Sequence, residues 1–214
     1  MNTIKPLEFG HVYHIYNRGI NGCQIFRTPK NFEYFLHLYT KYIDPVVDTY
    51  AWVLMKNHFH LLVRVKDLEE SFNSLTGKWE PVRLKNLSPS RQFSHLFNSY
   101  AKAYNKQERR SGALFERPFN RILVDNDKYF KELVVYIHRN PVKHKIRDEV
   151  KDYPWSSYGS IVSIKPSFES KETVLGWFDS VGNFKLKHRR ARHEKELNNY
   201  LPPQGWVKNN LSGL

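Results

Sequence analysis

WVLMKNHFHLLVRV, residues 52–65, is the stretch that decides how the rest of the chain folds. Its two apolar runs are broken by Lys56-Asn57, which predicts a β-hairpin with a short polar turn. His58 and His60 alternate with Phe59, so strand periodicity places both imidazoles on one face and the phenyl ring on the other. Each buried imidazole needs a hydrogen-bond partner or a ligand to offset its desolvation. The pair therefore predicts half of a metal site, and two satisfied core histidines are the alternative.

The segments around this hairpin alternate between strands and helices. In chain order we expect a strand at 11–19, a helix from Thr28-Pro29, and hairpin strands at 48–55 and 58–66. A helix capped by Ser90, a strand at 117–124 and a helix at 128–139 should follow. Asp125 or Asp127 is expected to cap this last helix, and Pro141 to end it. That order predicts an α+β fold, a ferredoxin-like sandwich with a mostly antiparallel sheet and helices packed on one face.

Residues 1–150 are expected to form one domain and residues 151–214 an aromatic and basic C-terminal extension. Within the first part, residues 67–89 are polar and lack clear periodicity, so we interpret them as an excursion loop. The extension begins with an aromatic turn at 153–158 and continues with a short helix at 172–178. Residues 185–200 are expected to form a basic helix or tail.

The charge of the chain bounds its partners. Its 214 residues contain 34 Lys and Arg against 21 Asp and Glu, which gives a formal net charge of +13. Such an excess favours a polyanionic partner. No apolar run of about 18 residues exists to span a bilayer, the start after Met1 lacks a secretion signal, and Cys23 is the only cysteine. We therefore expect a cytoplasmic protein with no membrane partner.

The last predicted core helix supplies the other half of the site. Tyr136 and Asn140 are four residues apart, so an α-helix projects both from one side. If this helix packs across the strand of His58 and His60, the candidate ligands are two imidazoles and one carboxamide. This mixed set suits Mg²⁺ or Mn²⁺ beside a substrate phosphate, with zinc as the alternative. A boundary aromatic for Tyr136 and a helix C-cap for Asn140 are the structural alternatives.

Two motifs together resemble a known family. His58-Phe59-His60 within residues 52–65, joined with YIHRNPVK at 136–143, is similar to the single-tyrosine HUH transposases, and specifically to the REP-associated tyrosine transposases. YHIYNRG at 13–19 and WSSY at 155–158 are also similar to that branch, so the resemblance runs from about Gly10 to Tyr158.

The resemblance implies a fold, a site and an activity. It implies an HUH nuclease fold for residues 1–150, a divalent metal held by His58 and His60 with Asn140 as third ligand, and Tyr136 as nucleophile. The expected enzyme is a metal-dependent DNA transposase that nicks single-stranded DNA beside a hairpin, forms a 5′-phosphotyrosine intermediate and rejoins strands. The alternative is a non-catalytic regulator that binds DNA or RNA hairpins. A hydrolytic metalloenzyme built on a barrel strand is disfavoured by the length of the chain. The resemblance also implies a protein associated with the nucleoid of a prokaryote. A monomer and a homodimer both remain open.

Charge and position select the DNA-binding candidates. Basic side chains are expected to contact phosphates, and aromatic or amide side chains near the first strand to stack on unpaired bases or hydrogen-bond to them. These candidates are Tyr13, Tyr16, Asn17, Arg18, Arg109, Arg110, Arg117, Arg121, Lys143 and the basic run at 185–190. For any single Lys or Arg, a solvated surface charge is the alternative. No role in the site is expected for His11, His14, Tyr100 or Tyr104.

Overall fold

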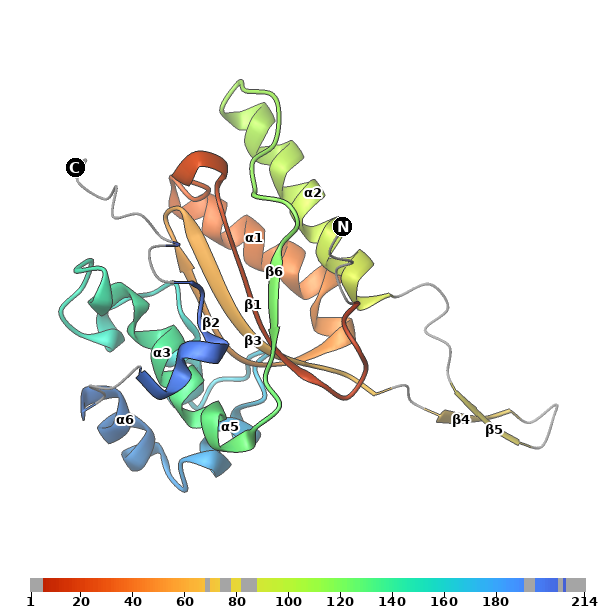
Figure 1. Cartoon of the computed structure of the whole chain (residues 1–214), viewed down its shortest axis with the longest axis vertical. Coiled ribbons are helices and arrows are strands. Elements are labelled where there is room, and N and C mark those ends of the chain that lie inside the picture. Colours follow the sequence, from red (N-terminus) through yellow and green to blue (C-terminus); the bar gives the residue numbers. More distant parts are fainter. Residues whose placement is uncertain are drawn as a thin grey trace.

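A computed structural model describes residues 6–67, 70–73, 78–81, 88–190, 195–203 and 206. Four antiparallel strands form the central sheet in the order β2-β3-β1-β6 (Figure 1). The strands are β1 Val12–Arg18, β2 Val47–Met55, β3 His58–Val65 and β6 Asn120–Leu123, and the longer helices are α1 Pro29–Tyr42, α2 Pro89–Gln107 and α3 Phe130–Lys143. This strand order, with α1 between β1 and β2 and α2 between β3 and β6, is the expected ferredoxin-like arrangement.

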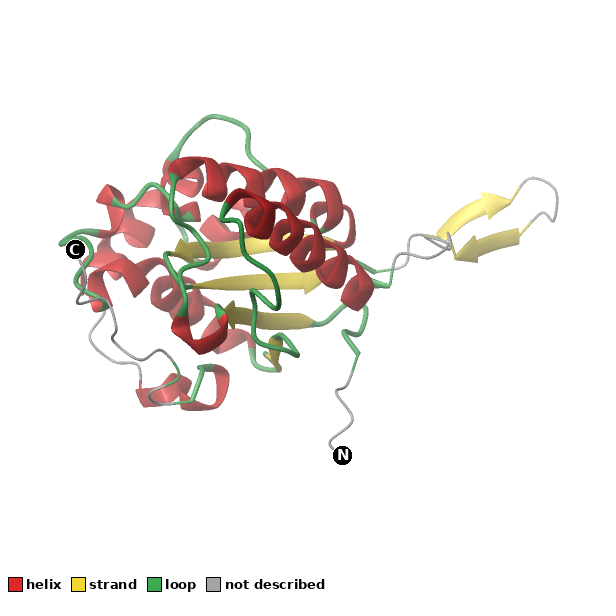
Figure 2. Cartoon of the chain, turned by 90° about the horizontal axis from the view of Figure 1, so that it is seen from above, coloured by secondary structure: helices red, strands yellow, loops and turns green. Residues whose placement is uncertain are grey.

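The sheet separates two apolar cores. Phe35 of α1, Phe59 of β3 and Phe93 of α2 belong to the core on one face. Leu62 of β3 and Ile137 of α3 belong to the core on the other face. The prediction of helices on one face alone therefore needs correction, since α3 covers the second face (Figure 2). The nearly continuous apolar runs of β2 and β3 are the sequence signal of a sheet that is buried on both sides.

Three local predictions also need correction. Helix α2 begins at Pro89 with Ser88 as its N-cap, and the Oγ atom of Ser90 instead accepts a hydrogen bond from the backbone of Leu7. The short helical turn before α3 is capped by the side chain of Asn126 rather than by an aspartate. Within the predicted excursion loop at 67–89, β4 Glu70–Asn73 and β5 Lys78–Pro81 pair as a separate antiparallel ribbon. Apart from Asp67, the other residues of this loop up to 87 lie outside the described ranges.

Pro141 lies inside α3 and does not end it. A proline in a helix removes one backbone donor, here the donor that would face the carbonyl of Ile137. The Nδ2 atom of Asn140 lies 3.5 Å from that carbonyl oxygen and 3.0 Å from the carbonyl oxygen of Tyr136. The side-chain amide thus replaces the missing donor, and the helix continues to Lys143.

The C-terminal extension packs against the outer side of α3. It contains α4 Ser157–Val162, α5 Lys171–Trp177, α6 Val181–Arg190 and a 3-10 turn at Lys195–Tyr200. His138 of α3 connects to this extension on both sides, at 2.9 Å from the Nε2 atom of His188 and 2.7 Å from the Oγ atom of Ser157. Among the described residues, none of the helices combines the length and apolar character needed to cross a membrane.

Candidate active site

His58 and His60 project from β3 toward α3. They are 0% and 1% exposed, and Phe59 between them points into the core under α1 and α2. The strand alternation predicted from the sequence is therefore confirmed. Both imidazoles are enclosed between the sheet and the helix that carries Tyr136 and Asn140.

The protonation pattern of His58 follows from its hydrogen bond. Its Nδ1 atom lies 2.7 Å from the Oδ1 atom of Asn57, in the hairpin turn. An amide oxygen can only accept, so Nδ1 of His58 donates. The neutral ring then has its lone pair on Nε2. This is the form in which an imidazole binds a metal.

A longer chain of hydrogen bonds fixes His60 in the same tautomer. The Nδ1 atom of His14 lies 2.6 Å from the backbone oxygen of Tyr200, which can only accept, so His14 donates there. The Nε2 atom of His14 is consequently an acceptor, and it lies 3.0 Å from the Nδ1 atom of His60. His60 therefore donates from Nδ1 and has its lone pair on Nε2.

Burial keeps these rings neutral. It lowers the pKa of His58 to about 3, with His144 as a further cause, and the pKa of His14 to about 4. Burial, followed by the neighbouring His14 and His58, holds the pKa of His60 well below its ordinary value. Neutral imidazoles are available as ligands, because protonation competes with metal binding.

The residues present fit a divalent metal ion. The Nε2 atoms of His58 and His60 are buried and have no hydrogen-bond partner within the described residues. Such orphaned acceptors are costly unless something binds them. The side chain of Asn140 interacts with His58 and opposes the lowering of its pKa, so a carboxamide stands beside the pair. In the described part of the chain, no three His, Cys, Asp or Glu side chains are grouped to hold a metal, so the third protein ligand would be the amide of Asn140. Two imidazoles and one amide leave coordination positions for water and phosphate oxygens.

Tyr136 lies against the histidines. Its ring centroid is 5.7 Å from that of His60 and 6.1 Å from that of His14. The Nζ atom of Lys143, two turns along α3, lies 5.1 Å from the centre of the Tyr136 ring. The structure thus brings the predicted nucleophile, both predicted histidines, the predicted amide and one predicted DNA-binding lysine to one place.

Trp206 packs over this group from the C-terminal extension. Its ring centroid is 6.0 Å from those of both His58 and His60, and 4.8 Å from that of Tyr16. The guanidinium of Arg18 lies 5.2 Å from the Trp206 ring and forms an ion pair of 2.7 Å with Glu116. An aromatic and a cationic side chain therefore border the candidate ligands.

The other predicted DNA-binding residues are dispersed. Tyr13 is 5% exposed in the core under α1 and α2. Asn17 is also buried, and its Nδ2 atom donates to the backbone of Glu116. Arg109 and Arg110 follow the end of α2, while Arg117 and Arg121 line a hollow beside that helix. In the basic run at 185–190, His188 is buried and the four Lys and Arg side chains are exposed.

Sequence reasoning missed four residues of this site: His14, His144, Tyr200 and Trp206. His14 had a usable signal, because it alternates with Tyr16 on the face of β1 that β3 continues with His60. The ring of His144 lies 5.3 Å from that of His58. His144 is the C-cap of α3, a position outside the expected helix because Pro141 was expected to end it. Tyr200 and Trp206 had none, since no local pattern shows where a distant segment folds back.

Comparisons with known proteins bear on the family resemblance and on the fold. No model of a known protein family matches the sequence. A Haemophilus influenzae protein assigned by name to the REP-associated tyrosine transposases is 28% identical over 113 residues, which are 52% of this chain and 58% of that relative. The chain thus spans little more than half the length of that relative.

A solved structure has the same fold. It is a REP-associated tyrosine transposase bound to a REP hairpin, and it matches with a TM-score of 0.58 and 18% identity, over 78% of this chain and 88% of the other. The predicted resemblance and the predicted fold class are therefore confirmed.

Proposed function

We propose that this chain is a hairpin-directed nuclease and strand-transfer enzyme for single-stranded DNA, which cleaves with Tyr136. The similarity to REP-associated tyrosine transposases, one of them solved with a REP hairpin, supports the substrate class. The basic excess of the sequence supports a nucleic-acid partner.

One observation favours catalysis over binding alone. Two neutral imidazoles have buried Nε2 atoms without hydrogen-bond partners among the described residues, and the ring of Tyr136 lies against one of them. A protein that only bound DNA would gain nothing from two orphaned acceptors in its core, because each one lowers stability. We infer that His58 and His60, with Asn140, hold Mg²⁺ or Mn²⁺.

The bound ion would neutralise charge on the non-bridging oxygens of the scissile phosphate. Tyr136 would form a bond from its phenolic oxygen to phosphorus, while the bond from phosphorus to the 3′ oxygen breaks. The phenol loses one proton and the released 3′-hydroxyl gains one, so the step is balanced. The phosphotyrosine link conserves the phosphodiester bond energy, and the 3′-hydroxyl of a second strand can reverse it without a nucleotide cofactor.

The test uses labelled single-stranded hairpin oligonucleotides with randomised flanks and Mg²⁺ or Mn²⁺. We expect a covalent protein–DNA adduct with the wild-type chain and none with Tyr136→Phe. Tyr34→Phe is the matched control, since Tyr34 is exposed on α1, which packs on the other face of the sheet. An adduct that persists in Tyr136→Phe would refute the nucleophile. Tight hairpin binding without any adduct would instead support the non-catalytic regulator.

A further inference from the structure

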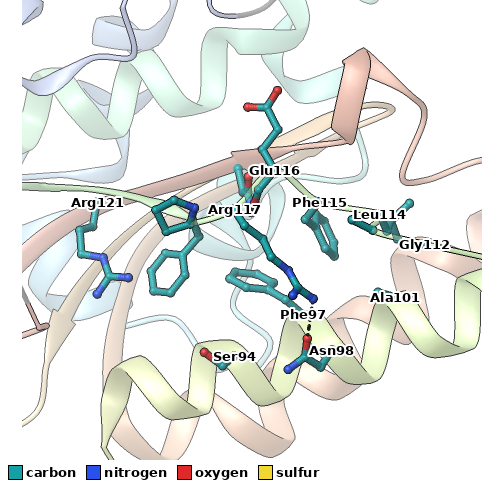
Figure 3. Close-up of a pocket in the computed structure, with 14 residues that line it drawn as sticks. Ser94, Phe97, Asn98, Ala101, Gly112, Leu114, Phe115, Glu116, Arg117 and Arg121 are labelled. Atoms are coloured by element: carbon teal, nitrogen blue, oxygen red, sulfur yellow. Dashed lines mark hydrogen bonds between the residues drawn. The ribbon is translucent and has the colours of Figure 1, made fainter. Parts of the chain in front are cut away.

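A hollow of about 500 Å³ lies beside α2 (Figure 3). Its lining residues Phe97 and Phe115 belong to the core under α1 and α2. Phe97 of α2 and Phe115 contribute aromatic lining, with ring centroids 5.3 Å apart. Helix α2 also contributes Ser94 and Asn98, which are one turn apart and exposed. The volume falls within the range of about 300–1,000 Å³ found for small-ligand sites.

The border of the hollow is positively charged. Arg117 is exposed and donates to the Oδ1 atom of Asn98 across 3.3 Å, as the dashed line in Figure 3 shows. The guanidinium of Arg121 lies over the ring of Phe119, 3.9 Å from its centre. The one carboxylate that lines the hollow, Glu116, is ion-paired with Arg18. An anionic ligand would thus meet two guanidinium groups beside an aromatic surface.

Strand β1 connects this hollow to the candidate active site. Asn17 lines the hollow. Its neighbours Tyr16 and Arg18 point to the other face, where they contact Trp206 beside His58 and His60. The hollow and the candidate active site thus lie on opposite faces of three consecutive residues of β1. A DNA strand that passes the end of β1 would therefore reach both places.

We propose that the hollow binds one unpaired nucleotide of the DNA substrate, with the base against the aromatic surface and the phosphate at Arg117. This inference rests on the proposed function. Aromatic surfaces hold unpaired bases by stacking, and Arg side chains both pair with phosphates and lie flat against bases. Two guanidinium groups beside an aromatic lining, on a chain with a net charge of +13, favour a ligand that is both anionic and aromatic.

Two variants test the site in independent ways. Ser94→Trp fills the hollow from an exposed position without touching the core, and Arg117→Ala removes a positive charge. Arg91→Ala is the control, because Arg91 is exposed on the same helix and does not line the hollow. The probe is a random-sequence single-stranded DNA with one 5-iodo-deoxyuridine, which crosslinks to neighbouring aromatic residues under ultraviolet light.

We expect the crosslink in the wild-type chain to map to residues 94–121, and Ser94→Trp and Arg117→Ala each to weaken binding about tenfold. Arg91→Ala should bind like the wild type. Normal binding by both variants, or a crosslink that maps elsewhere, would overturn this site while leaving the proposed function intact. A wild-type chain that binds no single-stranded or hairpin DNA would overturn both.

Discussion

The Nε2 atom of His14 lies 3.0 Å from the Nδ1 atom of His60, and this contact determines which nitrogen of His60 is available to a metal ion. His14 is itself oriented by the backbone oxygen of Tyr200, at 2.6 Å. A candidate ligand on β3 is thus positioned by a residue of β1 and by the C-terminal extension.

His14→Leu should weaken Mn²⁺ binding by about 10- to 100-fold, the usual effect of removing a residue that orients a metal ligand. The reason is that Nδ1 of His60 loses its acceptor, so the ring is no longer fixed in one tautomer. Electron paramagnetic resonance of free Mn²⁺ measures the affinity. His14→Gln, whose amide oxygen can still accept from His60, should bind better than His14→Leu. His11→Leu, at an exposed histidine, should change nothing, and equal affinity in all variants would contradict this role.

Asn140 has two roles that substitution can separate. Its Nδ2 atom donates to the carbonyls before Pro141, and its oxygen is the proposed third ligand. Asn140→Asp retains an oxygen ligand, so Mn²⁺ affinity should persist, whereas Asn140→Leu should lose it. Both variants lose the donated hydrogen bonds and should be destabilised by about 1–2 kcal/mol in urea unfolding. Unchanged Mn²⁺ affinity in Asn140→Leu would remove Asn140 from the ligand set.

Trp206 should report metal binding by its fluorescence. Its ring centroid is 6.0 Å from those of both His58 and His60, a separation at which paramagnetic Mn²⁺ quenches an indole. We expect saturable quenching by Mn²⁺ that disappears in Trp206→Phe, whereas Trp177→Phe should retain it because Trp177 of α5 packs against Phe130, the first residue of α3. Quenching that persists fully in Trp206→Phe would place the ion elsewhere.

Stability should fall below pH 6.5 because of His188. Burial lowers the pKa of its ring from 6.5 to about 4, so between these values the unfolded chain binds more protons than the folded chain. The free energy of unfolding therefore decreases as the pH falls through this window and is unaffected above it. His188 should account for a loss of about 2 kcal/mol between pH 7.5 and 5.

Urea unfolding at the two pH values measures this loss. His188→Gln, which can still accept the hydrogen bond from His138, should show a smaller difference than the wild-type chain. An identical pH dependence in the two proteins would contradict the assignment to His188.

The elements and the pair at His58 and His60 could be predicted from the sequence because periodicity is a local property. The prediction that Pro141 ends the helix was wrong because it considered only the backbone donor that proline lacks. The side chain of Asn140 supplies a donor in its place. The role of His14 depends on Tyr200, 186 residues later, and no local pattern contains that contact. The position of α3 on the second face could have been predicted from the sequence, because β2 and β3 are apolar on both sides.

Tandem mass spectrometry of the trapped protein–DNA adduct identifies the residue that attacks the DNA. After reaction with a single-stranded hairpin library and Mn²⁺, nuclease digestion should leave a nucleotide that is joined through its 5′-phosphate to the peptide that contains Tyr136. We expect the modified residue to be Tyr136 itself. A nucleotide joined through its 5′-phosphate to any other residue, such as Tyr129 or Tyr158, would contradict the assignment of Tyr136 as nucleophile.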